Sequence, residues 1–316
     1  MTVLDNRDVD AALWPLIEGF PPIDVGADTL AGFRAAFTEM SVMPDPATHP
    51  DVRISEVQLS CSGSPARAIR GLLFTPDTHR RTGALLHVHG GGYVMGSAEM
   101  DGPRNVALAR ATGCTILSVD YRLAPEHPHP AALEDCHDAL LWLVAQAKGS
   151  ASLDGRIGVI GESAGGGLAA AVALMARDRR SAPLACQAII YPMLMPPARS
   201  LDAASPDART GRHIWTRASN DYCWSAFLGG ASADPATIAG IAPDLTRLPP
   251  TFLAVGELDL FVHDNLAHVA RLLAAGVSVE AHLYPGAIHG FDRMVDAPVS
   301  VRYTRELVDF IRRHLA

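Results

Sequence analysis

The chain has 316 residues, 48% of them hydrophobic, and carries 34 acidic against 26 basic residues for a net charge of −8. This length suits one α/β domain that carries an insertion or cap rather than two independent domains. The acidic balance, without any cluster of Lys or Arg, argues against nucleic acid and against an anionic membrane surface as partners.

The N-terminal region differs in pattern from the rest of the chain. Residues 10–20 and 28–43 carry helical apolar spacing, which Pro44, Pro46 and Pro50 then interrupt. Short β-rich runs come next and later alternate with helical stretches. The pattern predicts strands over 54–59, 68–74, 84–88, 115–119, 157–160, 188–191, 252–255 and 279–284, and helices over 104–111, 131–147, 167–178, 265–275 and 301–314. Early strands with short connections, then alternation, predict a mostly parallel sheet covered on both faces, with antiparallel strands at its start.

Residues 193–244 break this alternation with a segment rich in Pro, Ala, Ser and Asp that includes a helix-like piece, 214–227. A long insertion after a strand is typical of a lid or binding element. We expect 1–50 to form the N-terminal part of a cap, 51–192 the first part of the core, 193–244 the cap insertion and 245–316 the second part of the core. Aromatic side chains from these parts would line an apolar substrate pocket or bury the cap against the sheet: Phe33, Phe37, Tyr93, Trp215 and Tyr222.

The most informative pattern is Gly161-Glu162-Ser163-Ala164-Gly165, which lies between an apolar run, 156–160, and an Ala-rich run, 168–176. It predicts a strand, a sharp turn and a helix, because glycines on both sides of Ser163 let neighbouring backbone approach closely. The turn would expose the Ser163 hydroxyl and place the Ala164 N–H at a helix start, where a developing negative charge is favoured. By itself the pattern is weak, since a serine at a helix start is most often a cap.

Three further elements strengthen the interpretation of Ser163 as a nucleophile. His89-Gly90-Gly91-Gly92 directly follows the apolar run 85–88, so its backbone N–H groups can point into a shared site and bind an oxyanion. Losing one such donor in a comparable site costs roughly 3–4 kcal/mol of barrier. Asp259 follows the strand predicted over 252–255, and His289 follows the strand predicted over 279–284. Sites of open parallel sheets lie at this carboxyl edge.

Together with residues 120–126 and His289-Gly290-Phe291, these motifs resemble the hormone-sensitive-lipase-like, or bacterial family IV, esterases of the α/β-hydrolase superfamily. The resemblance runs from about the first strand to the C-terminus. It implies an α/β-hydrolase fold: a mostly parallel eight-stranded sheet flanked by helices, with a helical cap. It also implies that Ser163 is the nucleophile, His289 the general acid and base, and Asp259 the orienting carboxylate. The N–H groups of Gly90, Gly91 and Ala164 would form the oxyanion hole.

The sequence around Asp259 departs from the pattern that is usual in the family. The family usually reads Asp-Pro-Leu-Arg-Asp here, whereas this chain reads Asp259-Leu260-Phe261-Val262-His263-Asp264, so that His263 aligns with the second aspartate. Glu257 and Asp264 are the other carboxylates nearby. Asp259 is assigned because its distance from the strand end fits.

Other residues nearby are expected to support the site. His89 would hold the glycine loop by hydrogen bonds, Arg122 would pair with a carboxylate, and Glu162 would hydrogen-bond behind the nucleophile.

The resemblance implies a serine carboxylesterase that hydrolyses small, uncharged esters with short to medium acyl chains through an acyl-enzyme, without metal or cofactor. A non-catalytic receptor on the same scaffold, like the plant gibberellin receptors, is disfavoured because those lack the triad histidine, whereas His289 is present. An amide or carbamate hydrolase would use the same residues. A homodimer is expected, because strand 279–284 would lie at a sheet edge that needs covering.

Composition also bears on location and redox state. No apolar run approaches the ~20 residues that span a bilayer, and residues 1–8 lack the order of a signal peptide, which predicts a cytoplasmic protein. The five cysteines, Cys61, Cys114, Cys136, Cys186 and Cys223, are odd in number and form no CxxC pair. They therefore indicate buried free thiols rather than disulfides or a zinc site.

Overall fold

The computed structural model describes residues 8–20, 23–60, 68–77 and 81–316. Its centre is one eight-stranded sheet in the order β1-β2-β4-β3-β5-β6-β7-β8. The strands are β1 (Val52–Ser60), β2 (Ala68–Pro76), β3 (Thr82–Val88), β4 (Thr115–Val119), β5 (Leu153–Glu162), β6 (Cys186–Ile190), β7 (Thr251–Gly256) and β8 (Val279–Tyr284). β2 runs antiparallel to β1 and β4, and every other pair is parallel. The predicted mostly parallel sheet with an antiparallel start is confirmed.

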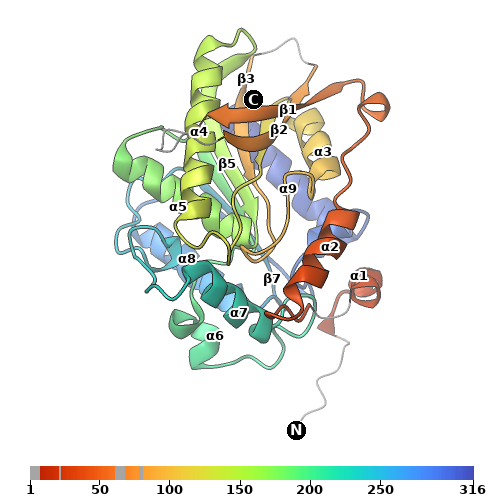
Figure 1. The fold of residues 1–316 in the computed structure, drawn as a ribbon, viewed down its shortest axis with the longest axis vertical. Coiled ribbons are helices and arrows are strands. Elements are labelled where there is room, and N and C mark those ends of the chain that lie inside the picture. The colour runs from red at the N-terminus through yellow and green to blue at the C-terminus, as the bar shows by residue number, and fades with distance from the viewer. Residues whose placement is uncertain (1–7, 21–22, 61–67, 78–80) are drawn as a thin grey trace.

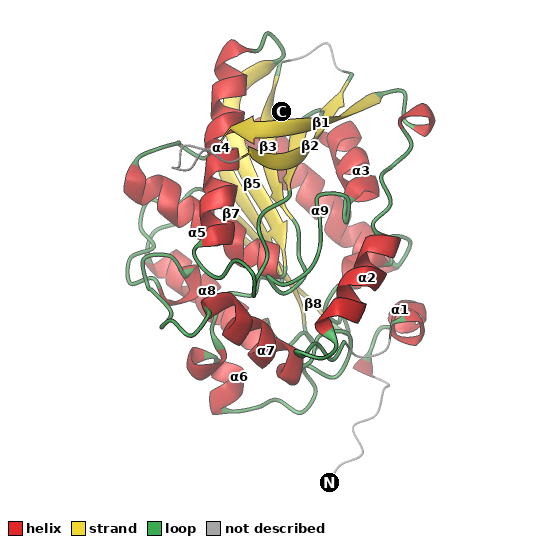
Figure 2. Ribbon diagram, in the orientation of Figure 1, coloured by secondary structure: helices red, strands yellow, loops and turns green. Residues whose placement is uncertain are grey.

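Helices cover both faces of the sheet. Figures 1 and 2 show α4 and α5 on one side and α3 and α9 on the other. The bounds of the sheet-covering helices are α3 (Gly102–Thr112), α4 (Ala131–Gly149), α5 (Ala164–Arg179), α8 (Val262–Ala274) and α9 (Pro298–Leu315). α5 begins three residues before its predicted start, because the run Gly165 to Gly167, although poor in helix propensity, is held by tertiary packing.

The glycines of α5 have a steric reason. A Cβ on Gly165 would lie 2.0 Å from the Val88 carbonyl oxygen and 2.4 Å from that of His89. Only glycine lets α5 approach the end of β3 this closely. Every residue of α5 from Ala164 to Ala176 is buried, so this helix forms the centre of one layer of the core.

The N-terminal region and the insertion after β6 lie together beyond the strand ends (Figure 1). They contain α1 (Trp14–Gly19), α2 (Leu30–Met40), α6 (Leu201–Ala204) and α7 (Arg217–Leu228). Ile23 and Trp215 form a β-bridge, and the Ile23 N–H donates to the Ile214 carbonyl at 2.8 Å. The Val25 N–H donates to Ser219 Oγ, 194 residues away in the chain, also at 2.8 Å. Buried hydrogen bonds, one between backbone groups and one from a backbone N–H to a serine hydroxyl, therefore join the two segments.

The structure also bears on the predictions about the cysteines, a membrane-spanning helix and the sheet edge. The four described cysteines, Cys114, Cys136, Cys186 and Cys223, are buried and free, as predicted, whereas Cys61 lies outside the described residues. No helix in the described part of the chain combines the length and apolar character that crossing a membrane requires. β8 lies at the predicted sheet edge, and the homodimer stays a prediction.

The α8 helix contains a buried histidine that links folding to pH. Burial, together with the nearby positive charge of Arg271, lowers the pKa of His268 from 6.5 to about 3. The unfolded chain then binds a proton that the folded chain does not, so stability falls as the pH drops from 6.5 toward 3. We expect His268 to cost about 2 kcal/mol of unfolding free energy between pH 7 and pH 5.

Urea unfolding of the wild type and of His268→Gln at the two pH values measures this cost. The variant should lose about 2 kcal/mol less than the wild type, and a substitution at the exposed His127 serves as the control. Equal losses in the wild type and His268→Gln would contradict the prediction.

Candidate active site

Ser163 stands on a strained turn between β5 and α5. Its φ of 55° and ψ of −120° belong to a region that side-chain-bearing residues seldom occupy. The Ser163 N–H donates to the Ile190 carbonyl at 2.9 Å, and its carbonyl accepts from the Met193 N–H at 2.8 Å. A Cβ on Gly161 would lie 2.3 Å from the Gly165 carbonyl oxygen. The turn therefore needs this glycine and is held by neighbouring strand ends.

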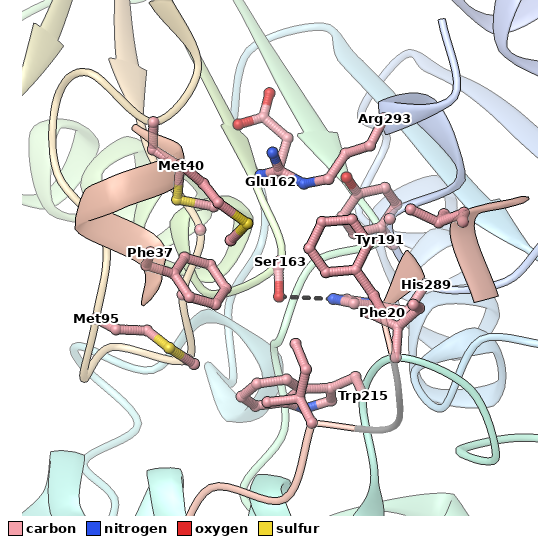
Figure 3. Close-up of a pocket in the computed structure, with 18 of the residues that line it drawn as sticks. Phe20, Phe37, Met40, Met95, Glu162, Ser163, Tyr191, Trp215, His289 and Arg293 are labelled. Atoms are coloured by element: carbon pink, nitrogen blue, oxygen red, sulfur yellow. Dashed lines mark hydrogen bonds between the residues drawn. The ribbon is translucent and has the colours of Figure 1, made fainter. Parts of the chain in front are cut away.

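His289 connects Ser163 to Asp259. Its Nε2 lies 3.0 Å from Ser163 Oγ (Figure 3), and its Nδ1 lies 2.8 Å from Asp259 Oδ2. Asp259 is fully buried, and its other oxygen accepts from the Phe261 N–H at 2.8 Å. A buried carboxylate facing Nδ1 favours the tautomer with the proton on Nδ1, which leaves Nε2 free to accept the serine proton. The geometry is that of a nucleophile, a base and an orienting acid.

The other two carboxylates near the acid face elsewhere. Asp264 Oδ1 accepts from the Leu201 N–H at 2.8 Å, and burial raises the pKa of this carboxyl group. Glu257 accepts from the Gly286 N–H at 3.2 Å and pairs with Arg209 at 3.3 Å. Of the three candidates, only Asp259 hydrogen-bonds to His289 among the described residues.

The glycine loop after β3 is held by contacts of His89 and lies beside Ser163. The Nδ1 of His89 is 2.8 Å from the Gly90 carbonyl oxygen, and the His89 ring stacks on Tyr121 with centroids 4.2 Å apart, so His89 holds the loop as predicted. Gly91 has a φ of 108°, and a Cβ there would lie 2.2 Å from the Met95 carbonyl oxygen. Only glycine can adopt this backbone conformation at so close an approach.

The N–H groups predicted for the oxyanion hole are available. Within the described residues, no backbone partner is found for the N–H of Gly90 or Gly91, and both residues line the same cavity as Ser163. Ala164 is the first residue of α5, so its N–H has no partner inside the helix. These donors can receive negative charge that develops next to Ser163.

The cavity has a volume of about 480 Å³ and combines these polar groups with an apolar wall. Phe37 and Trp215 line it, as predicted, and Figure 3 shows them on different sides of Ser163. Trp215 packs closely on the loop, since a Cβ on Gly92 would lie 2.5 Å from its ring.

The pocket prediction is wrong for Phe33, Tyr93 and Tyr222, which do not line the cavity. Tyr93, with a φ of 68°, turns inward, where its hydroxyl donates to the Met193 carbonyl at 2.7 Å and its ring stacks on Phe227. Phe33 and Tyr222 are partly buried and pack against the hydrophobic core. These three residues follow the alternative that the sequence left open, in which the aromatic side chains bury the cap against the sheet.

Sequence reasoning missed other lining residues, most visibly Phe20, Met40, Met95, Tyr191 and Arg293 (Figure 3). Tyr191 directly follows β6 at the edge that carries Ser163, and Arg293 lies four residues after His289, so a search of positions just beyond strand ends and motifs could have found both. The methionines carry no local signal, because they reach the cavity from a helix and a loop.

Glu162 hydrogen-bonds behind the nucleophile, as predicted. Its carboxylate lies 3.0 Å from His87 Nε2 and 3.0 Å from the guanidinium of Arg104. Arg104 also pairs with Asp292 at 2.7 Å, and Asp292 accepts from the Tyr191 hydroxyl. Buried charges that are paired in this way brace the floor of the site rather than react. Similarly, Arg122 pairs with Asp135 at 2.8 Å, which confirms its predicted ion pair.

His87, Asp101 and Glu162 bring potential metal-ligand atoms within 4.8 Å of one another. The arrangement is part of the ion-pair network, because the Arg104 guanidinium already neutralises Glu162. A divalent cation would have to compete with that fixed positive charge.

Comparisons with known proteins agree with this geometry. A family model described as the α/β-hydrolase fold matches residues 85–293. The chain belongs to the α/β-hydrolase family. Its similarity to hormone-sensitive-lipase-like esterases is confirmed by its relatives. It is 33% identical over 291 residues to the carboxylesterase NlhH of Mycobacterium tuberculosis, covering 90% of this chain and 89% of that protein.

Two further proteins are similar over most of the chain. The ethyl acetate hydrolase of Pseudomonas putida is 31% identical over 269 residues, covering 83% of this chain and 82% of that one. Among solved structures, a bacterial heroin esterase superposes with a TM-score of 0.89 and 32% identity, covering 98% of this chain and 99% of its own. All three of these proteins are ester hydrolases, and so is this chain.

Proposed function

We propose that this carboxylic ester hydrolase works through Ser163, His289 and Asp259 by way of an acyl-enzyme. The observation that carries the proposal is the unbroken hydrogen-bonded chain from Asp259 through His289 to Ser163 Oγ, which ends in a cavity. In the first step, Ser163 Oγ attacks the ester carbonyl carbon while His289 Nε2 takes its proton. The buried Asp259 carboxylate stabilises the imidazolium that forms.

The tetrahedral intermediate places its oxyanion against the N–H groups of Gly90, Gly91 and Ala164. His289 then gives its proton to the departing alkoxide, and the alcohol leaves. Water attacks the remaining acyl-enzyme with His289 again as base, which releases the carboxylic acid and restores Ser163. These steps need only groups of this chain and water.

The cavity supports small substrates. At about 480 Å³ it fits within the range of pockets for small molecules, and its wall is largely apolar. We therefore propose small esters with short to medium acyl chains. We also propose that the N-terminal region and the insertion after β6 act together as a cap, because Phe37 and Trp215 reach the cavity from these two segments. Amides are a second candidate substrate class, because the same residues would cleave them.

Covalent labelling tests the nucleophile. A fluorophosphonate should modify Ser163, because it is the hydroxyl paired with a base beside free N–H donors. Trypsin cuts after Arg156 and Arg177, so the added mass should appear on peptide 157–177, at Ser163. His289→Gln should slow labelling strongly, since it removes the base. A label on another serine, or none on the folded protein, would contradict the proposal.

A further inference from the structure

Arg293 brings a guanidinium group into the cavity that holds Ser163. It ends the short 3-10 turn Phe291–Arg293, just after His289, and Figure 3 shows its side chain extending toward Glu162 beside Tyr191. Its side chain keeps 42% of its surface exposed although it lines the cavity. The serine mechanism proposed above gives this charge no role.

The carboxylates around Arg293 are almost fully buried, including Glu162, which contributes to the cavity wall. Glu162 is 3% exposed and is held by His87 and Arg104, and the Asp292 side chain is 4% exposed and is held by Arg104. Asp101 is likewise 4% exposed. Glu162 and Arg293 both line the cavity, and of these two charged side chains Arg293 is the more exposed, at 42% against 3%.

The guanidinium group of Arg293 also has N–H donors without a hydrogen-bond partner among the described residues. The one hydrogen-bonded ion pair found for it among the described residues joins Nη2 to Asp101 Oδ1 at 3.4 Å, a long pairing through a single N–H. A guanidinium has five N–H donors in a planar fork. Arg104 provides the contrast, because it pairs with Glu162 and Asp292 and donates to the Tyr303 hydroxyl. Arg104 is fully engaged in bracing the structure, whereas most N–H groups of Arg293 have no hydrogen-bond partner among the described residues.

We propose that Arg293 selects esters that also carry a carboxylate, a substrate class that rests on the esterase function proposed above. The carboxylate would accept two hydrogen bonds from the guanidinium fork on the Glu162 side of the cavity. The apolar part of the same substrate would lie against Phe37, Met95 and Trp215, which line the cavity away from Arg293 (Figure 3). An uncharged analogue of the same shape gains only the apolar contacts.

A matched pair of substrates tests this selection. 3-Acetoxybenzoate carries the carboxylate, and 3-acetoxybenzamide has the same shape without the charge. The measured quantity is the ratio of kcat/KM for the acid to kcat/KM for the amide. Arg293→Met, which keeps the length and apolar stem, should lower this ratio by about 10- to 100-fold, mainly through KM of the acid. Arg293→Lys should give an intermediate ratio, because it keeps the charge and loses the fork.

The control is Arg179→Met, which removes an exposed arginine paired with Glu134 outside the cavity and should leave the ratio as in the wild type. An unchanged ratio in Arg293→Met, or an equal loss for both substrates, overturns the inference, as does a wild type that cleaves p-nitrophenyl acetate but not 3-acetoxybenzoate. If Ser163→Ala keeps full activity on p-nitrophenyl acetate, the failure is that of the esterase mechanism instead.

Discussion

Ser163→Ala is expected to lower kcat for p-nitrophenyl acetate and p-nitrophenyl butyrate by about 10⁴-fold or more. The variant removes the oxygen atom that forms the acyl-enzyme in the proposed mechanism, whereas the proposed oxyanion donors and the cavity remain. Residual turnover would come from those donors acting on water, as in other enzymes that lose a triad member. Initial rates at several substrate concentrations measure the loss.

The fold should persist in this variant. The Ser163 backbone is held by the Ile190 carbonyl and the Met193 N–H, and alanine keeps both bonds. Circular dichroism and a melting curve check this. Ser181→Ala is the matched control, because Ser181 bonds to His137 outside the cavity, and its kcat should match the wild type. Undiminished activity in folded Ser163→Ala would refute the mechanism.

Asp259→Asn is expected to lower kcat by about 10⁴-fold. The amide can turn its NH₂ toward His289 Nδ1, which favours the tautomer with the proton on Nε2 and leaves no lone pair to accept the Ser163 proton. The side chain is fully buried, so water does not replace the lost acceptor. Because the base is still present but in the wrong form, the loss should fall mainly in kcat.

Asp264→Asn provides the comparison for this assignment. Its Oδ1 accepts from the Leu201 N–H, and an asparagine oxygen can do the same, so activity should fall less than about tenfold. Steady-state kinetics of both variants with p-nitrophenyl butyrate measure the difference. Losses of the same size in the two variants would remove the reason for choosing Asp259 as the acid.

Much of the fold is predictable because its patterns are local. The eight strands and the five sheet-covering helices follow from hydrophobic runs and periodicity, and the parallel order follows from their alternation. The predicted start of α5 is wrong because the run Gly165 to Gly167 has low helix propensity. Close packing against the end of β3 decides that start, and packing with residues some 75 positions earlier leaves no local trace.

The sequence by itself determined which residues are candidates for the chemistry of this protein. Ser163, Asp259 and His289 each follow a strand, and parallel strands end at one sheet edge, so their meeting was implied by order alone. Glycines around Ser163 and after His89 marked where backbone must approach closely.

Only the tertiary structure decided which side chains meet at the site. It separated Asp259 from Asp264 by showing which carboxylate meets His289 Nδ1. It turned Tyr93 into the core and brought Arg293 into the cavity. The direction of a side chain on a turn depends on what distant segments leave open, and no periodicity in the chain encodes that.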